Sequence, residues 1–381
     1  MAGTGACPPG GRRGQWCREP GRAVTVQTSA GVRERLAGHR ERFDALFAEY
    51  FTAVGGQALP RSSFVPEALD LVRDMSLRGG KRLRVALVHE AARLVTDEAV
   101  AGADAAAISI ELLQTHGLIH DDIIDDSPVR RGAPSVYYAY QERFPERPQT
   151  ALGLAVLAGD LAAFLSVRVL LDAPVPAPLR QAMAAVHASA AADTVIGQFL
   201  DLERDFGPVP GREALDTVSD YKTARYSLLA PLRLGLLAAG GDPDAHGEEL
   251  ARYARLVGVS GQMRDDYLDL FGDAALIGKP AGSDLRSGRR SYAVCAVLAA
   301  ASGGERELVQ EALDAPGCPP ETVARVQDIA RRHGVDEHLR AEIRRGAESA
   351  SAVAASWRGR WRDDAVEFFE RLPLWGAQRA L

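Results

Sequence analysis

Four aspartates lie together in the segment Gln-Thr-His-Gly-Leu-Ile-His-Asp-Asp-Ile-Ile-Asp-Asp, residues 114–126, which continues a strongly apolar stretch. On a helix, Asp121 and Asp125 share one face, and Asp122 and Asp126 share the next. Like charges at this spacing oppose helix formation by about 0.2–0.5 kcal/mol per pair. A cation is therefore expected beside them, and such oxygen ligands suit Mg²⁺, which completes its shell with water and phosphate oxygens.

A second run of aspartates has the same Asp-Asp-x-x-Asp spacing. Asp265, Asp266 and Asp269 again end an apolar segment, about 140 residues after the first run. One such motif could be an exposed acidic helix end, although acids at a helix C-terminus oppose the helix dipole. Two of them predict two carboxylate walls that face each other across a cavity, with metal ions between.

Basic residues accompany these motifs. Only three of the 45 basic residues are lysines, namely Lys81, Lys222 and Lys279. Codon bias would explain the scarcity of lysine, but each lysine lies near a glycine turn or an acidic cluster. Arginine pairs follow the two acidic motifs at 130–131 and 289–290. Metal ions, arginine forks and lysine point charges are what a bound diphosphate requires, because its charge cannot enter an apolar cavity unpaired.

The composition excludes several classes of protein. The 381 residues carry a net charge of −6, with 46% hydrophobic and 25% charged residues, which is typical of a globular enzyme and unlike a nucleic-acid coat protein. The most apolar stretch, 151–173, contains Asp160 and Arg168, so we expect no membrane span, which needs roughly 20 largely uncharged residues. Four scattered cysteines indicate a reduced, cytoplasmic protein.

The elements that must position these groups are helices. Apolar residues recur at spacings of three and four, strand signals are scarce, and no repeat is found. We expect residues 1–28, rich in Gly, Pro and Arg, to form a disordered tail, and residues 29–381 to form one large all-α bundle domain around a central cavity. The predicted helices are 31–53, 64–76, 80–95, 102–125, 149–172, 178–206, 212–221, 223–239, 244–272, 287–301, 305–314, 320–333 and 337–371.

In motif order, residues 40–300 resemble the trans-isoprenyl diphosphate synthases, or polyprenyl synthetases, with a likeness to geranylgeranyl diphosphate synthases. The matching motifs are Gly-Gly-Lys-Arg-x-Arg at 79–84, the first Asp-Asp-x-x-Asp with Arg-Arg-Gly, Gly-Gln-x-x-Asp at 197–201, Lys-Thr-Ala at 222–224, and the second Asp-Asp-x-x-Asp with Gly-Lys. The resemblance implies the all-α isoprenoid synthase fold, a homodimer, and condensation of isopentenyl diphosphate with an allylic diphosphate.

The resemblance also implies roles for individual residues. About three Mg²⁺ would be bound per active site: two by Asp121 and Asp125, and the third by Asp265 with support from Asp269, while Asp122 and Asp266 complete the two metal motifs. The allylic diphosphate would be held by Arg130, Lys222, Thr223, Gln262 and Lys279. Isopentenyl diphosphate would be held by Lys81, Arg84 and Arg131, with Gln114 where many members have His. We expect catalysis to depend on Asp121, Asp125, Lys222 and Asp265.

Three positions depart from the family pattern. Val85 stands where Pro is common, and Gly261 stands where Phe is frequent. Arg289 occupies a position usually filled by Lys, so the clamp on the allylic diphosphate could differ here.

Two other functions remain open at this point. A class I terpene cyclase also ionises an allylic diphosphate, but it usually carries an Asn/Ser/Glu motif as its second metal site. A non-catalytic subunit of a heteromeric synthase typically loses one aspartate motif, whereas both are intact here. A synthase is therefore favoured.

The length of the product should depend on the residues before Asp121. A residue five positions back lies about 7.5 Å lower on the helix axis, and in this family large aromatics four and five positions before the motif stop the chain at C15. Here these positions are Gly117 and His116, which close the cavity only partly, and Leu113 and Leu112 should close it one turn deeper. This favours the C20 product, geranylgeranyl diphosphate, over C15 (farnesyl diphosphate) or C25 and longer.

Overall fold

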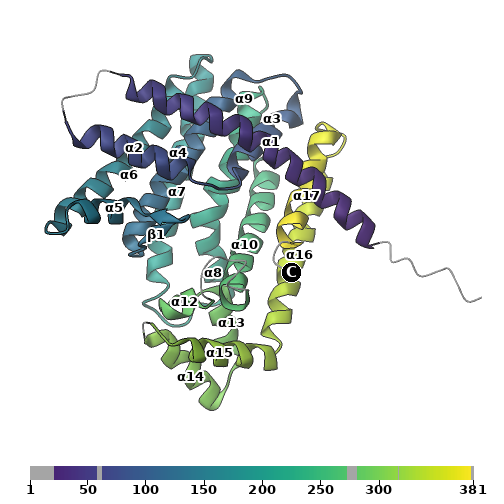
Figure 1. Ribbon diagram of the computed structural model, residues 1–381. Coiled ribbons are helices and arrows are strands. Elements are labelled where there is room, and N and C mark those ends of the chain that lie inside the picture. The colour runs from purple at the N-terminus through teal and green to yellow at the C-terminus, as the bar shows by residue number, and fades with distance from the viewer. Residues whose placement is uncertain (1–20, 58–61, 273–280, 316, 379–381) are drawn as a thin grey trace, which may run out of the picture.

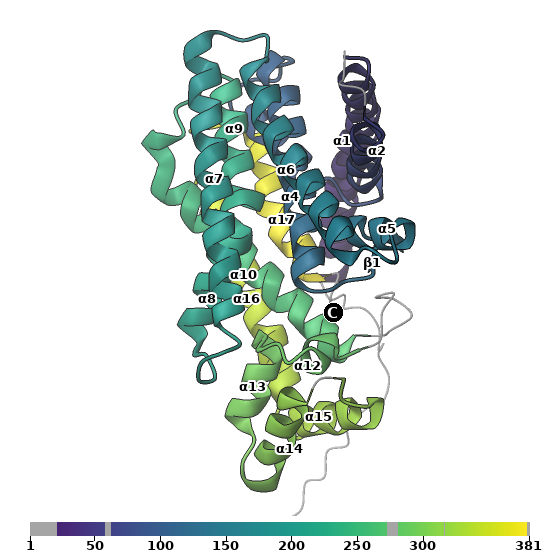
Figure 2. The ribbon, with the colours of Figure 1, turned by 90° about the vertical axis from the view of Figure 1, so that its left-hand side faces the viewer.

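The protein is an all-α bundle built on long helices that run side by side. The computed structural model describes residues 21–57, 62–272, 281–315 and 317–378. Its central helices stand upright in Figure 2 and are α4 (Ala101–Ile124), α6 (Pro148–Leu171), α7 (Ala177–Glu203) and α10 (Gly247–Phe271). Both aspartate motifs lie at the C-terminal ends of such helices, α4 and α10, as the sequence predicts.

An N-terminal layer covers one side of this bundle (Figure 1). It packs a core of aromatic and aliphatic side chains, among them Phe43, Phe47, Leu112 and Tyr140, against α4 and α6. Burying such side chains stabilises each helix by about 1.5–3 kcal/mol per large residue. The layer consists of α1 (Gly21–Gly55), α2 (Phe64–Leu77) and α5 (Val136–Arg143), whereas α3 (Leu83–Val95) packs inside the bundle, against α4 among others.

A π-helix, η1 (Asp220–Leu229), carries Lys222 and lies between α7 and α10. It follows α8 (Arg212–Ser219) and continues into α9 (Ala230–Ala238). Two glycines allow the close approach: a Cβ on Gly197 of α7 would lie 2.2 Å from the backbone nitrogen of Lys222, and one on Gly258 of α10 would lie 2.4 Å from the Cβ of Ala224. The Gly of the Gly-Gln-x-x-Asp motif is therefore needed to seat the backbone of Lys222.

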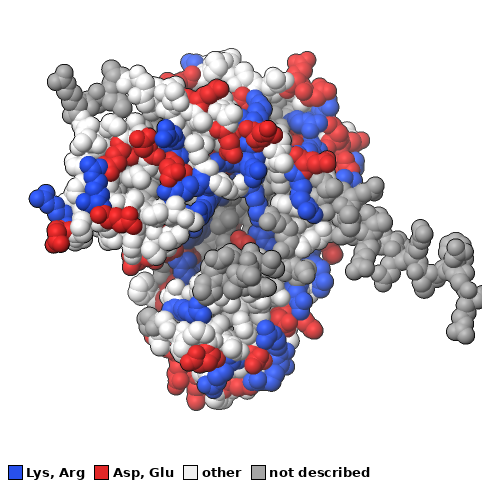
Figure 3. All heavy atoms as spheres, in the orientation of Figure 1, with Lys and Arg blue, Asp and Glu red and all other residues white. Residues whose placement is uncertain are grey.

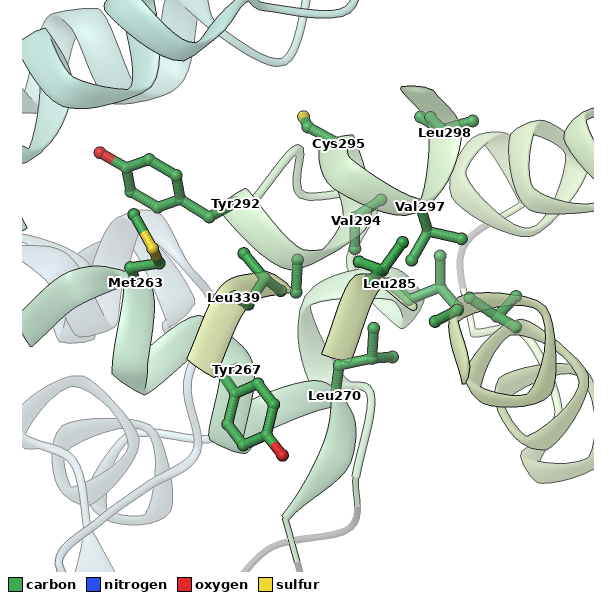
Figure 4. Packing of buried hydrophobic residues seen from close by; sticks show 14 of the residues in the cluster. Met263, Tyr267, Leu270, Leu285, Tyr292, Val294, Cys295, Val297, Leu298 and Leu339 are labelled. Atoms are coloured by element: carbon green, nitrogen blue, oxygen red, sulfur yellow. The ribbon is translucent and has the colours of Figure 1, made fainter. Parts of the chain in front are cut away.

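The lower part of the molecule supports the second aspartate motif. Figure 4 shows Met263, Tyr267 and Leu270 of α10 among side chains of the following helices, with Tyr292 and Leu339 close by. The helices are η2 (Asp244–His246), a short 3₁₀ turn before α10, and then α12 (Ser283–Arg286), α13 (Tyr292–Ala300), α14 (Gly303–Asp314), α15 (Pro320–Arg332), α16 (Val335–Ala355) and α17 (Asp363–Gln378).

Several sequence predictions need correction. α1 begins at Gly21, so residues 21–28 belong to a helix rather than to the expected tail; residues 1–20 lie outside the described residues, where the tail stays a prediction. The helix predicted over 337–371 is two helices, because Gly359 takes a positive φ of 76° between them. Helix α5 was not predicted. Nor was the two-residue antiparallel pair of β1 (Val129–Arg130) and β2 (Ala133–Pro134).

Helix α6 is strongly apolar along its length. Among the described residues it is the one helix long and apolar enough to cross a membrane by length and composition, with a window of mean hydropathy 2.0 despite Asp160 and Arg168. In the bundle it packs along α4, and 39% of that window is buried inside the protein. The core helix of a soluble protein also has these properties.

Candidate active site

The first aspartate motif presents only some of its carboxylates to the cavity. Asp121 and Asp125 are partly exposed, whereas Asp122 is fully buried and accepts a 2.7 Å hydrogen bond from Nε of Arg130 on β1. Asp126 has a positive φ and is turned outward, where the hydroxyl of Tyr138 donates to it at 2.9 Å. The structure therefore brings Asp121 and Asp125 to the site and uses Asp122 to fix Arg130.

The carboxylates that lie close together at the C-terminal end of α4 favour the binding of a cation. Burial raises the pKa of Asp125, the adjacent Asp121 raises it further, and Arg289 offsets only part of the effect. Burial also raises the pKa of Asp122 against the influence of Arg130. A carboxylate with a raised pKa, such as Asp125, is stabilised in its charged form by an added positive charge, which fits a divalent metal with oxygen ligands.

Cations from other elements face these acids across the cleft. Lys222 Nζ donates to Asp121 Oδ1 at 3.2 Å and to Asp201 Oδ2 at 2.6 Å, and Arg289 pairs with Asp125. Burial acts to lower the pKa of Lys222, but Asp201 and Asp121 outweigh it and raise that pKa, so the ammonium stays charged. In Figure 3, Lys and Arg side chains surround the hollow between the upper and lower parts of the molecule.

The second aspartate motif also divides into exposed and buried groups. Asp265 lies at the mouth with its side chain 59% exposed, while Asp266 accepts 2.8 Å hydrogen bonds from Gln262 Nε2 and the backbone nitrogen of Tyr292. Asp269 is buried and accepts hydrogen bonds from the hydroxyl of Ser283 and, at 2.9 Å, from the backbone nitrogen of Asp284. Asp265 is thus the accessible carboxylate of this motif, and the other two hold the turn before α13 in place.

Burial matters most for Asp266. Burial, with a further contribution from the nearby Asp284, raises the pKa of this carboxyl to about 7. The middle aspartate of each motif, Asp122 and Asp266, is therefore a buried hydrogen-bonding group. Sequence spacing did not separate it from the first aspartate of each motif, because that distinction depends on which face of each helix packs inward.

A basic cavity of about 190 Å³ adjoins this region. Lys81, Arg84, Thr223, Gln262 and Trp375 are among its lining residues. Two of its cations, Lys81 and Arg84, come from the Gly-Gly-Lys-Arg-x-Arg segment, where Gly79 and Gly80 have positive φ values of 55° and 99°, and a third, Arg264, comes from α10.

Other basic residues near this cavity have structural partners. Arg82 is buried against Asp44 and Glu111, so it is not available to a ligand. Arg131 does not line the cavity; it packs beside Gly80, and its Nη1 donates to the carbonyl of Arg78 at 2.8 Å.

Gln114 joins this basic cavity to the centre of the bundle through hydrogen bonds. The hydroxyl of Tyr226 donates to Gln114 Oε1 at 2.7 Å, and Arg84 Nη2 donates to that hydroxyl at 2.8 Å and to Ser227 Oγ at 2.6 Å. Gln114 therefore positions Arg84 indirectly. Tyr226 was missed in the sequence analysis, because it lies on a π-helix whose phase an α-helical period does not give.

A third region is an apolar cavity of about 290 Å³ below Asp121. His116, Gly117 and Leu113 of α4 line it, and a Cβ on Gly117 would meet nothing within 4 Å. Leu112 does not face this cavity; it is fully buried in the N-terminal core, so the expectation that it closes the cavity was wrong. The other lining residues come from α7 and η1, and include Ala191, Thr194, Gln198, Phe199, Lys222, Thr223 and Tyr226.

Two histidines of α4 lie along the wall of this cavity and bond to backbone. His116 Nδ1 lies 3.2 Å from the carbonyl of Gly159, and His120 Nε2 lies 3.3 Å from that of Val156. Burial lowers the pKa of His116, and the neighbouring His120 lowers it further. Both rings are therefore held against α6 by backbone carbonyls. Lys279 falls outside the described residues.

Fold and site together define an all-α bundle in which two runs of aspartates lie beside cationic side chains, a basic cavity and an apolar cavity. The profile of the polyprenyl synthetase family matches residues 66–330. A short chain isoprenyl diphosphate synthase of Methanothermobacter thermautotrophicus is 31% identical over 294 residues, covering 74% of this chain and 82% of that protein. The farnesyl diphosphate synthase of Escherichia coli is 32% identical over 246 residues, which cover 62% and 77%.

A solved structure gives the same result. The geranylgeranyl pyrophosphate synthase from Corynebacterium glutamicum, crystallised with isoprenyl diphosphate and magnesium, superposes with a TM-score of 0.76 at 28% identity, covering 93% of this chain and 99% of that one. The chain belongs to the polyprenyl synthetase family. It is a trans-prenyltransferase of isoprenoid biosynthesis, and its class is metal-dependent.

Proposed function

We propose that this enzyme condenses isopentenyl diphosphate with allylic diphosphates in a Mg²⁺-dependent reaction and releases geranylgeranyl diphosphate, C20. The observation that carries the proposal is the position of Thr223, which lines both the basic cavity with Lys81 and Arg84 and the apolar cavity below Asp121. Two substrates bound in these cavities meet at one residue, so their reacting carbons lie side by side.

The donor set fits Mg²⁺. Asp121 and Asp125, and Asp265 opposite them, would hold the metal ions, of which we propose three. When bound, they would neutralise the departing diphosphate and so favour ionisation of the allylic carbon–oxygen bond.

Cationic side chains of the protein act together with the proposed metal ions. Lys222 and Arg289, already placed against Asp121 and Asp125, contribute fixed positive charge that needs no rearrangement during the reaction. Arg130 is held at the same end of α4 by Asp122. We propose that these three residues, with Thr223, Gln262 and Lys279, bind the allylic diphosphate.

The apolar cavity protects the cationic carbon from water. The double bond of isopentenyl diphosphate, held in the basic cavity by Lys81 and Arg84, attacks this carbon, and the proton then leaves to the departing diphosphate. The hydrocarbon tail extends from Asp121 past Gly117 and His116 toward Leu113. Because Gly117 leaves open space and His116 is only partly buried, the tail passes the level that stops C15 chains and is closed off deeper.

The direct test supplies purified protein with Mg²⁺, isopentenyl diphosphate and one allylic diphosphate at a time. We expect chain elongation, with the C20 alcohol as the main product after dephosphorylation and chromatography. Cyclised hydrocarbons would indicate a terpene cyclase, and no turnover would indicate a non-catalytic subunit. A C15 product alone would contradict the proposed chain length.

His116→Phe should shorten the product to C15. The larger ring enters the cavity at a level where the growing tail must pass, and overpacking of this kind is costly to relieve. Product chromatography measures the change. As a counterpart, Leu113→Ala removes bulk from the same wall one turn deeper and should lengthen the product. The proposed direction of the tail is wrong if neither variant changes the distribution.

We propose a homodimer, in which the exposed apolar face of α6 and α7 is covered by a second copy of the chain. Leu157 and Phe164 on α6 are 62% and 75% exposed, and Phe199 on α7 is 69% exposed. Large apolar groups this exposed mark an interaction surface. Coverage by a second copy, rather than by lipid, also agrees with a cytoplasmic enzyme without a membrane span, in which the described cysteines, Cys295 and Cys318, are free thiols.

Phe164→Glu should convert the dimer to a monomer. A buried, unpaired carboxylate at the centre of the face would be repeated in the partner by symmetry and would cost several kcal/mol. Sedimentation equilibrium measures the mass, and circular dichroism verifies the helix content. A wild-type protein that is monomeric at micromolar concentration and does not bind vesicles would leave this face without its proposed partner, and association with vesicles would indicate lipid instead.

A further inference from the structure

A buried polar cluster joins three helices deep in the bundle. His187 of α7 is 1% exposed, and its Nδ1 lies 2.9 Å from the hydroxyl of Ser109 on α4. Its Nε2 lies 2.9 Å from the hydroxyl of Ser166 on α6. Ser109 and Ser166 are themselves fully buried. These three residues take no part in the reaction proposed above.

The hydrogen bonds of this cluster define its protonation. The hydroxyl of Ser166 also donates to the carbonyl of Ala163 at 2.6 Å, so it must accept from Nε2–H of His187. Nδ1 is then the acceptor, and the hydroxyl of Ser109 donates to it. Burial lowers the pKa of His187 to about 4, so the ring is neutral near neutral pH. Both ring nitrogens are satisfied, and the ring is fixed in one orientation.

The cluster lies directly beneath the apolar cavity. Leu113 of α4 and Ala191 of α7 are the lining residues nearest to the N-termini of these helices. Ser109 lies four residues before Leu113, and His187 lies four residues before Ala191, so each is on the same helix face one turn deeper. One turn is about 5.4 Å along the axis.

Helix α6 confirms this level independently. His116, which lies seven residues after Ser109 on α4, contacts the carbonyl of Gly159 on α6. Ser166 lies seven residues after Gly159, and because α6 runs antiparallel to α4, Ser166 reaches the level of Ser109. All three members of the cluster therefore lie at one height, about 10 Å below His116 by the helical rise.

We propose that His187, fixed by Ser109 and Ser166, is the floor of the hydrocarbon tunnel and sets the longest product that the enzyme releases. A growing tail that passes Leu113 meets a ring that cannot turn aside without breaking two buried hydrogen bonds. A hydrocarbon offers no replacement partner, and no water is expected in so apolar a place. Below His116 and Leu113, the cavity thus ends at the hydrogen-bonded cluster of Ser109, Ser166 and His187. This inference rests on the proposed synthase activity.

The test compares two substitutions at the same position. His187→Ala removes the ring and opens the floor, whereas His187→Phe also loses both hydrogen bonds but keeps the bulk. With farnesyl diphosphate, isopentenyl diphosphate and Mg²⁺, His187→Ala should raise the ratio of C25 and longer products to C20 by about tenfold, because the space left by the missing ring admits a longer tail. His187→Phe should give no such rise.

Ser109→Ala is a smaller substitution than His187→Ala, and we expect it to lower the free energy of unfolding less. It frees Nδ1 of His187 while changing little volume, so the ring can turn, and the product should lengthen in the same direction by a smaller factor. If His187→Ala does not fold, Ser109→Ala decides: an unchanged distribution overturns the floor. Active wild-type enzyme with unchanged products in folded His187→Ala also overturns it. A wild-type protein that elongates nothing contradicts the synthase proposal itself.

Discussion

Asp121→Ala is expected to lower kcat by about 10²–10³ or more, comparable to the loss of a preorganised group that stabilises the transition state. Asp121 lies at the cavity, partly exposed, beside Asp125 and within 3.2 Å of Lys222. Its loss removes one of the proposed metal ligands and leaves Lys222 with Asp201 as its remaining partner. Steady-state kinetics at saturating Mg²⁺ measure the change, and EDTA should abolish activity of the wild-type enzyme.

The sequence supplies a matched control in the same acidic run. Asp126 is exposed, turned outward by its positive φ, and bonded to Tyr138. Asp126→Ala removes the same charge five residues away and should keep kcat within about twofold, since surface substitutions of this kind change little. Equal losses in the two variants would show that the general negative charge of the segment matters, and not a ligand at Asp121. Full activity in EDTA would contradict the mechanism.

The second aspartate motif gives a related expectation for the same mechanism. Asp265 is the exposed acid of its motif, so removing its carboxylate should affect turnover with little effect on folding. Asp266 and Asp269 hold the backbone of the following turn and α13 through hydrogen bonds. Their roles differ from that of Asp265, although the spacing of the motif is symmetrical.

Much of the site could be predicted from the sequence because the chemistry lies in local patterns. Two Asp-Asp-x-x-Asp runs at the ends of apolar helices specify carboxylates at the mouth of a cavity, and the structure has Asp121, Asp125 and Asp265 accessible there. Helical periodicity likewise located most of α4, α6, α7 and α10 to within a few residues.

Other features depend on packing that no local pattern reveals. Asp122 and Asp266 follow the first aspartate of each motif by one residue, and that step turns each side chain into the protein. Leu112 differs from Leu113 by the same step and faces another core. The π-helix at η1 changes the phase of Tyr226, and it forms because Gly197 and Gly258 let it approach two helices at once.

Contacts between distant segments were also beyond local patterns. Trp375 reaches the basic cavity from α17, almost 300 residues after Lys81. The cluster of Ser109, Ser166 and His187 comes from three helices, and each residue alone looks like an ordinary polar residue in an Ala-rich helix. Only the fold shows that they meet.

Lys222→Ala is expected to lower kcat by about 10²–10³, because a fixed cation beside the reacting diphosphate is lost. Lys222 donates to Asp121 and Asp201 at once, and these two acids keep it charged against the effect of burial. Lys222→Arg should also impair turnover, by about tenfold, because a planar guanidinium does not replace a compact ammonium between two carboxylates. Gly197 packs directly on the backbone of Lys222, so the longer side chain cannot be accommodated by moving the helix.

Arg225 provides the control for this substitution. It lies three residues later on the same π-helix and pairs with Asp193 and Asp220 at about 3 Å, away from the apolar and basic cavities. Arg225→Ala removes a similar ion pair and should change stability slightly without changing kcat. The comparison separates chemistry from support of the π-helix. Near wild-type kinetics for Lys222→Arg would mean that lysine is present at this position through codon bias, whereas a loss confined to the two Lys222 variants identifies its ammonium as the group that acts on the substrate.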